Sequence, residues 1–353
     1  MAEFAYEPEP EVHLAPGESA REISGRSPWR IAARRLVRNR VAMAALALFL
    51  LIVIVCLLAP VYAKHVAHTD PNASNVSGTT VINGKRVDVL QAPQGGLGLG
   101  EVPIGPTWHS NYLVGADNQG RDVMARTLYG GRNSLLIGVS SAVICCLIAL
   151  VVGVISGFFR GWTDAFISRT MDLIWAFPVF LLAISLSTVL LTKQNGLNWG
   201  PIHISSTSLW VPTAIIAIVY VPYVFRPVRG QVLSVREKEY VEASIAQGAS
   251  NFRLMFSEVL PNVISTVIVL LPLMIATTIL TEAALSFLGI GVQDPQASWG
   301  TIIQDGQALL YTRPWVAIVP GIFIVLTVLS LNLLGDGVRD ALDPRAKVRI
   351  GAE

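Results

Sequence analysis

The sequence predicts an all-α polytopic membrane protein with six transmembrane helices and both termini in the cytoplasm. Of its 353 residues, 52% are hydrophobic and only 14% are charged, which is too little polar surface to cover a water-soluble globule of this size. A helix needs about 20 residues to cross ~30 Å of hydrocarbon, and six stretches without Asp, Glu, Lys or Arg are long enough. These stretches are Val41–Ala63, Asn133–Phe159, Leu173–Thr192, Gln194–Phe225, Asn262–Thr281 and Pro314–Gly335.

The fourth stretch exceeds one span and opens with polar, turn-rich sequence, so we place its helix at about Leu209–Phe225. An even number of spans puts both termini on one side of the membrane. Cytoplasmic segments carry an excess of Lys and Arg, and here these residues precede the first span and follow the last. Both termini are therefore expected in the cytoplasm. The basic residues concerned are Arg21, Arg26, Arg30, Arg34, Arg35, Arg38, Arg40, Arg345, Lys347 and Arg349.

Membrane orientation also accounts for the net charge of +2, so nothing indicates binding to nucleic acid. The first span is longer than the ~7–15 residue apolar core of a signal peptide, and we expect it to be retained as an anchor. The three cysteines lie within predicted spans, where they pack as small apolar side chains and indicate neither a disulfide nor a metal site. They are Cys56, Cys145 and Cys146.

Two further patterns concern local structure. Residues 79–82 and 86–90 are β-prone and flank Asn83-Gly84, which predicts a hairpin in the first external loop. The second span carries three glycines at four-residue spacing, so one face of this helix is expected to approach a neighbour closely. These glycines are Gly153, Gly157 and Gly161.

Charge and turn residues divide the chain into five parts. The first is rich in Glu and Pro and cannot bury a core, so it is expected to be disordered. The expected parts are a disordered cytoplasmic tail (1–28), an entry helix with the first span (29–63), an extracytoplasmic loop with an amphipathic segment (64–132), a five-helix core that includes a long loop at 228–260 (133–335), and a cytoplasmic tail (336–353).

The cytoplasmic loop 228–260 is too long for a turn and too polar to span. We predict a first helix over Arg236–Gln247, ended by Gly248, and a second helix capped by Ser250. The second helix carries apolar residues at i, i+3, i+4 and i+7, which form one stripe. Such a stripe packs either on the inner ends of the chain's own helices or on a separate partner. The stripe consists of Phe252, Met255, Phe256 and Val259.

The same loop resembles the EAA signature of binding-protein-dependent ABC importers. That signature is Glu-Ala-Ala, three residues, Gly, nine residues, Ile, one residue, Leu-Pro. Here Glu242, Gly248 and Leu260-Pro261 fall in register, whereas Ser244 replaces the second Ala and Glu258 occupies the Ile position.

The resemblance implies a bundle like that of type I ABC importers, in which this loop is the coupling helix that docks in a groove of the ATPase. The sequence has no Gly-x4-Gly-Lys-Ser/Thr phosphate loop, so the chain itself is not expected to hydrolyse ATP. No catalytic residue and no cofactor is expected of this chain; two cytoplasmic P-loop ATPase subunits use the ATP and Mg²⁺. The resemblance assigns ATPase coupling to Tyr240, Glu242, Ala243, Gly248, Phe252, Met255, Leu260 and Pro261.

Three further segments are similar to the C-type permeases of the dipeptide, oligopeptide and nickel group. They are Trp29 with residues 34–40, residues 113–135 with their fixed Gly, Arg and Asp spacing, and residues 282–291 followed by Ser298-Trp299-Gly300. This similarity implies a bacterial plasma (inner) membrane protein, surrounded by membrane lipid, that shares its pathway with a homologous B-type permease. It also implies an extracytoplasmic substrate-binding protein and short peptides as cargo.

Three alternatives stay open at this point. The same machinery imports nickel chelates or other small solutes in some members of the group. A self-sufficient secondary transporter needs ionisable residues at mid-membrane, and the centres of the predicted spans carry none. A membrane scaffold has no need of the loop from Glu242 to Pro261.

Charged residues near the membrane are the remaining candidates. Glu282, near the outer end of the fifth span, is expected to line the pathway, whereas Asp172, near the inner start of the third, is expected to face headgroups. A second group is expected to form ion pairs on an external amphipathic helix, either at the outer mouth or as a structural network. This group contains Asp117, Gly120, Arg121, Asp122, Arg126 and Arg132.

Overall fold

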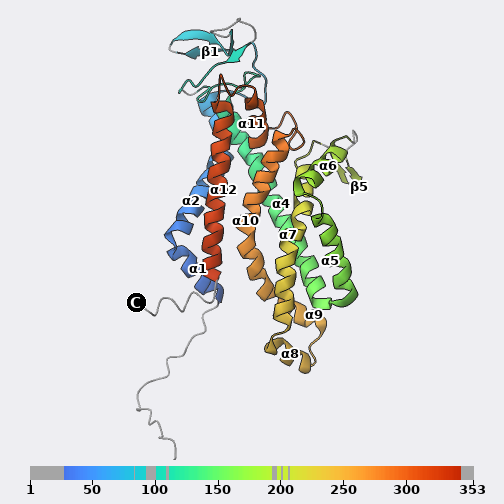
Figure 1. The fold of residues 1–353 in the computed structure, drawn as a ribbon. Coiled ribbons are helices and arrows are strands. Elements are labelled where there is room, and N and C mark those ends of the chain that lie inside the picture. The colour runs from blue at the N-terminus through green and yellow to red at the C-terminus, as the bar shows by residue number, and fades with distance from the viewer. Residues whose placement is uncertain are drawn as a thin grey trace, which may run out of the picture.

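The computed structural model describes residues 28–82, 84–92, 101–108, 111–192, 197–199, 202–205 and 207–342. The two predicted tails lie outside these residues, apart from Pro28 and residues 336–342. Within the described part, five helical segments are long and apolar enough to cross a membrane, and a bent pair makes a sixth if it counts as one span. The five are α2 (Arg40–Leu57), α4 (Val123–Phe159), α7 (Trp210–Arg236), the continuous segment Asn251–Phe287, and α12 (Trp315–Leu342) (Figure 1).

The bent pair consists of α5 (Gly161–Trp175) and α6 (Val179–Leu191), which meet at 87°. The third span was predicted over Leu173–Thr192, whereas the structure has two helices that meet within this stretch. The helix begins at Gly161, and it breaks before Pro178 because proline lacks an N–H and disfavours helical geometry at the preceding residue.

The other helices also extend past the predicted spans. Helix α4 begins at Val123 instead of Asn133, because the Asp122 carboxylate caps its first turn by accepting from the Ala125 N–H at 3.0 Å. Residues 123–132, which belong to the segment expected to form an external amphipathic helix, are therefore the first turns of α4. At the N-terminus, α1 (Pro28–Arg38) is separated from α2 by Asn39, whose side chain accepts from the Val41 and Ala42 N–H groups.

The core forms where α4 packs between α7 and α10 (Leu260–Phe287), while α12 packs against α2 and α10. Close approach of α4 and α7 depends on glycine, as the spacing predicted. A Cβ at Gly153 would lie 2.6 Å from Val228 Cγ1, and a Cβ at Gly157 would lie 2.7 Å from Val232 Cγ1. At Gly161, which begins α5, no such neighbour is found.

The first long loop, between α2 and α4, forms a small cap at one end of the bundle (Figure 1). Strands β1 (Thr79–Ile82) and β2 (Lys85–Asp88) pair antiparallel, which confirms the predicted hairpin. Short strands β3 (Leu90–Gln91) and β4 (Val102–Pro103) form a second pair, and α3 (Ala59–Tyr62) with a π-helical turn η1 (Ala63–Ala67) leads into the cap from α2.

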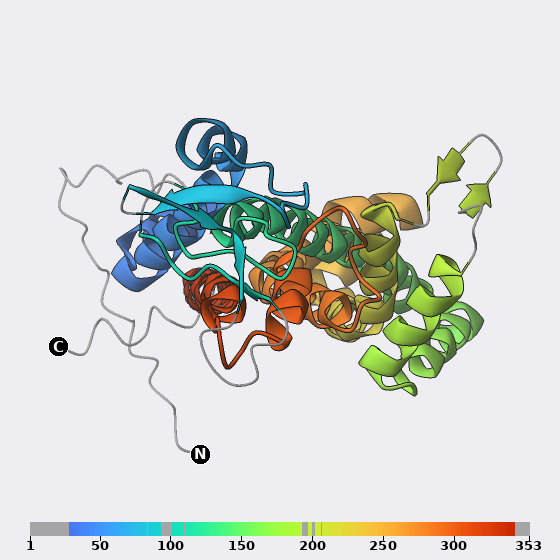
Figure 2. The same ribbon diagram turned by 90° about the horizontal axis from the view of Figure 1, so that it is seen from above.

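Two further elements lie at the same end as the cap. Helix α11 (Trp299–Gln307) follows α10 and begins with a capping box between Ser298 and Thr301. Strands β5 (Leu197–Trp199) and β6 (Ile202–Ile204) connect α6 to α7 and, seen from above, project from the opposite edge of the molecule (Figure 2).

At the other end of the bundle, α7 and α10 are joined by α8 (Glu239–Ala246), α9 (Asn251–Arg253) and the π-helical turn η2 (Leu254–Val259). Helix α9, η2 and α10 form one continuous helical segment. Helix α1 also lies at this end (Figure 1). The cap and the α7–α10 loop therefore occupy opposite ends of the same helices.

Candidate functional site

The α7–α10 loop turns sharply between its two helices. Gly248 adopts a left-handed conformation with φ of +81°, its N–H donates to the Ile245 carbonyl, and the Ala249 N–H donates to the Ser244 carbonyl. Ser250 then caps the next helix by accepting from the Arg253 N–H at 3.4 Å. The predicted stop and the predicted cap are both confirmed. The first helix is shorter than predicted because α7 itself continues to Arg236.

One face of the loop packs against the bundle. Val241, Leu254 and Val259 are buried, and the half-buried Met255 contacts the same core. The Tyr240 hydroxyl accepts a hydrogen bond from the Asn262 side-chain amide at 3.2 Å, which braces α8 against the first turn of α10. The loop is therefore held to the helices that it joins.

The other face is open. Phe252 and Phe256 are 69% and 48% exposed, and their ring centroids lie 4.4 Å apart. Glu242 and Ala243 are also exposed.

The prediction of a single apolar stripe was wrong, because Val259 lies on the buried face instead of beside the two phenylalanines. The difference arises from the π-helical turn η2. Its i→i+5 hydrogen bonds widen the helix, so Val259 no longer lies on the same face as Phe252, seven residues earlier. Of the two remaining motif residues, Leu260 is half-buried and Pro261 is exposed.

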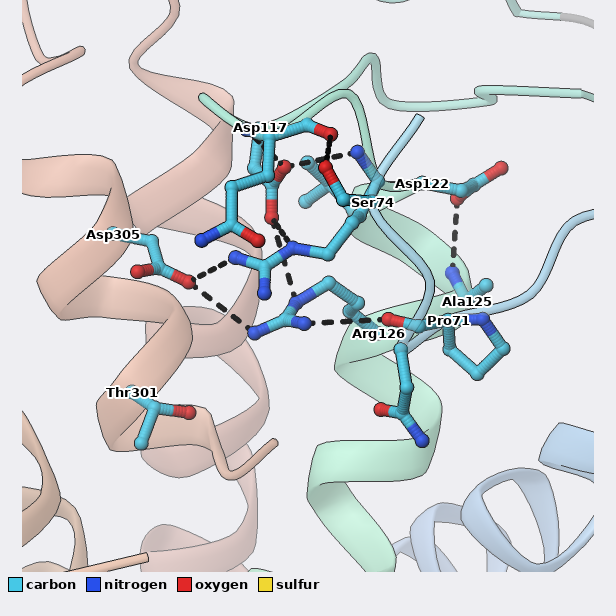
Figure 3. A network of polar contacts seen from close by, with 12 residues as sticks. Pro71, Ser74, Asp117, Asp122, Ala125, Arg126, Thr301 and Asp305 are labelled. Carbon is cyan, nitrogen blue, oxygen red and sulfur yellow. Dashed lines mark hydrogen bonds and ion pairs between the residues drawn. The ribbon is translucent and has the colours of Figure 1, made fainter. Parts of the chain in front are cut away.

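A buried ionic network joins the cap to the bundle at the other end (Figure 3). Asp117 Oδ2 lies 2.6 Å from Arg121 Nε and 3.5 Å from Arg126 Nε. Both arginines also reach Asp305 Oδ2 on α11, at 2.8 and 3.2 Å. Arg126 donates in addition to the Pro71 carbonyl. The four charges balance, as burial of ionic groups requires.

The network differs from the predicted cluster in its members. Asp122 caps α4 and accepts from the Tyr112 N–H at 2.8 Å instead of forming an ion pair, and burial raises the pKa of its carboxyl. Gly120 supplies a turn with φ of +72°, where a Cβ would lie 2.4 Å from the Asn75 carbonyl oxygen. Arg132 is exposed and lies over the Tyr129 ring, outside the network.

Asp305 was missed by the sequence analysis. It lies 184 residues from Arg121, so no local spacing pointed to the pair. The only available signal was its position shortly after Ser298-Trp299-Gly300, a segment already singled out. Burial raises the pKa of Asp305, against the opposing effect of Arg121 and Arg126.

Glu282 does not open onto a cavity in this structure. It is fully buried in α10, where its Oε1 accepts from Ser286 Oγ at 2.6 Å. Its second oxygen, Oε2, is buried without a hydrogen-bond partner among the described residues.

Two family models match the chain. The first is described as "Binding-protein-dependent transport system inner membrane component" and matches residues 149–348, more than half of the sequence. The chain belongs to this family of inner-membrane permeases. The second model, "N-terminal TM domain of oligopeptide transport permease C", matches residues 27–92, which hold α1, α2 and the hairpin β1–β2. Membership makes the permease a multi-pass component of an importer, working with a separate ATPase and a separate binding protein.

Relatives of this permease align over nearly its full length. The dipeptide transport system permease protein DppC of Alkalihalophilus pseudofirmus is 34% identical over 338 residues, 96% of this chain and 96% of that protein. The oligopeptide transport system permease protein OppC of Bacillus subtilis is 36% identical over 321 residues, 91% of each chain. The resemblance read from the α7–α10 loop is confirmed at the level of the family.

A solved structure shows the same fold. An inward-facing conformation of the MetNI methionine ABC transporter superposes with a TM-score of 0.52 at 18% identity, covering 62% of this permease and 97% of that chain. Over the aligned part, the permease therefore has the same fold as that chain of the methionine ABC transporter.

Proposed function

We propose that this permease forms half of a pathway for short peptides across a bacterial plasma membrane, and that the α7–α10 loop couples the pathway to ATP hydrolysis. The loop's exposed aromatic pair, Phe252 and Phe256, carries the proposal, because two adjacent phenylalanines on the outer face of a cytoplasmic loop need a partner to cover them. The names of the DppC and OppC relatives support peptides as cargo.

The loop suits this role because it is rigid where it meets the bundle. Phe252 belongs to the helical segment that continues as α10, so a displacement of this residue displaces the whole span. The hydrogen bond between Tyr240 and Asn262 ties α8 to the same helix. We propose that the loop docks in a groove of a cytoplasmic P-loop ATPase. When this ATPase closes on ATP and Mg²⁺, the groove would move α10 as a unit. Two such ATPases are proposed, one for this chain and one for a homologous B-type permease.

Orientation follows from the charges. Helix α1 lies at the same end as the loop and carries the basic residues Arg30, Arg34, Arg35 and Arg38. Cytoplasmic segments carry this excess of positive charge. We therefore place α1, the loop and both termini in the cytoplasm, and the cap on the outer side, where a substrate-binding protein delivers cargo.

The proposal is tested with the assembled transporter in proteoliposomes. The double variant Phe252→Ala/Phe256→Ala is expected to reduce ATP-driven uptake of radiolabelled trialanine at least tenfold and to weaken co-purification of the ATPase. The matched control is Tyr311→Ala, which removes a fully exposed aromatic ring near the outer end. Uptake and co-purification equal to those of the control would refute the role of the loop, and wild-type complex that takes up no peptide would refute the cargo.

A further inference from the structure

A seam of ion pairs runs between α5 and α7, the two helices at one edge of the bundle (Figure 1). Nearest the α7–α10 loop, Arg160 pairs with Glu237 at 2.8 Å. Farther along the helices, Arg229 binds Asp164 through two nitrogens, at 2.6 and 2.5 Å. The third pair is Arg226 Nη2 with Asp172 Oδ1, at 3.1 Å. These pairs were not predicted, because Asp172 and Arg226 flank the predicted spans and were placed at the membrane surface.

The third pair belongs to helices that are candidate membrane spans. Arg226 lies within α7, and Asp172 lies within α5, the first half of the bent pair. Arg226 directly follows the charge-free residues 210–225 of α7.

The pair is nevertheless open to its surroundings. The side chains of Arg226 and Asp172 are 48% and 53% exposed. Charged groups within membrane-spanning helices almost always face the bundle interior or a water-filled cavity, and they pair with one another. Because neither side chain is covered by this chain, the surface that carries them belongs to the pathway side of the permease.

Two aromatic rings complete this surface. The Arg226 guanidinium lies 4.8 Å from the centre of the Trp175 ring, and Trp175 stacks on Tyr223 with ring centroids 6.2 Å apart. Both rings are themselves partly exposed. The result is a neutral pair of opposite charges beside a flat apolar wall. Only one nitrogen of Arg226 and one oxygen of Asp172 are used in their ion pair, which leaves further donors and Asp172 Oδ2 for a ligand.

We propose that Asp172, Arg226, Trp175 and Tyr223 form a binding site in the translocation pathway for the charged termini of a peptide. The inference rests on the proposed peptide import. Arg226 binds the peptide carboxylate, because guanidinium groups match carboxylates in geometry and charge. Asp172 binds the peptide ammonium. The aromatic wall contacts the backbone and side chains between the termini, without preference for particular residues.

Charge complementarity favours a zwitterion over a simple ion. A lone anion or cation would satisfy one member of the pair and leave the other uncompensated in a medium of low dielectric constant. A peptide of two or three residues supplies both charges, no more than about 7–11 Å apart at ~3.5 Å per residue. Because the two protein groups neutralise each other when no peptide is bound, the site releases its cargo easily, as a pathway requires.

The test uses the complete transporter with its binding protein in proteoliposomes. A photoreactive p-benzoylphenylalanine replaces Trp175 in one preparation and Tyr223 in another, so that the loss of one ring does not decide the result. During ATP turnover, both preparations are expected to crosslink to tritiated trialanine, and the additional change Arg226→Gln is expected to reduce this crosslinking at least fivefold. Crosslinks found only to the partner permease or to lipid would overturn the proposal.

Transport rates provide the second readout. Arg226→Gln and Asp172→Asn are expected to slow trialanine uptake at least tenfold at saturating binding protein, while Arg226→Lys, which keeps the charge, retains more activity. The matched control is Glu237→Gln, which removes the exposed ion pair between the same two helices. Rates for Arg226→Gln equal to those of this control would overturn the site. Absence of uptake by the wild-type complex would instead contradict the peptide cargo itself.

Discussion

Replacing Asp117 with Asn tests whether the buried ionic network holds the cap to the bundle. Asp117 neutralises Arg121 and Arg126, and all three side chains are almost completely buried. The variant keeps an oxygen in place but leaves one positive charge unbalanced among buried groups. Breaking a buried pair in this way costs about 3–5 kcal/mol of unfolding free energy. Asp305→Asn is expected to cost less, about 1–3 kcal/mol, because Asp305 is partly exposed and water replaces part of the lost interaction.

The measurement is the unfolding of each purified variant in mixed micelles of increasing denaturing detergent, together with limited proteolysis of the cap. Arg132→Gln is the control, since Arg132 lies outside the network, and its effect is expected to stay within about 0.5 kcal/mol. The expected order of stability is the control above Asp305→Asn, and Asp305→Asn above Asp117→Asn. Equal stability of all three variants, with equal resistance of the cap to protease, would refute the structural role of the network.

Two further substitutions address glycines. Gly248→Val places a β-branched residue at φ of +81°, which distorts the turn between α8 and α9. ATP hydrolysis is expected to continue, while trialanine uptake falls at least tenfold. Normal uptake would contradict the coupling role of the turn. Gly157→Leu forces side-chain atoms into Val232 at the contact between α4 and α7. This variant is expected to destabilise the permease by about 1–3 kcal/mol in the same detergent titration. An unchanged unfolding midpoint would show that the two helices can move apart without cost.

The sequence located the spans because hydrocarbon excludes charge, and a search for charge-free stretches finds what lipid requires. The same search cannot find where helices end. Helix α4 starts ten residues before its predicted span because Asp122 caps it, and α7 continues past Arg226 because that charge is compensated by Asp172. An ion pair between two helices makes a charge compatible with the membrane, and its partner is not visible in the local sequence.

In the candidate site, too, local features could be predicted from the sequence and features that depend on packing could not. The stop at Gly248 and the cap at Ser250 depend on residues within one turn, so their residue types were sufficient to predict them. The face on which Val259 lies depends on the widened turn η2, and no residue type in this segment predicts such a turn. The pairing of Arg121 with Asp305 depends on the packing of α11 beside α4, which is a property of the whole bundle.

Helix α10 physically links the two ends of the permease. At the end of the bundle that holds the α7–α10 loop, α10 continues into the segment that carries Phe252; at the cap end, it contacts α11 so closely that a Cβ at Gly300 would lie 2.2 Å from the Ala283 carbonyl oxygen. Because α11 carries Asp305, the proposed displacement of α10 by an ATPase would reach the ionic network under the cap.

Gly300→Ala is expected to force α11 away from α10 and to break this link without touching the α7–α10 loop. Basal ATP hydrolysis should therefore persist, while its stimulation by the loaded binding protein should fall severalfold, because the signal from the outer side no longer reaches α10. Unchanged stimulation in a variant that still resists protease at the cap would show that the contact between α10 and α11 carries no signal, and that the two ends communicate through α4 or α12 instead.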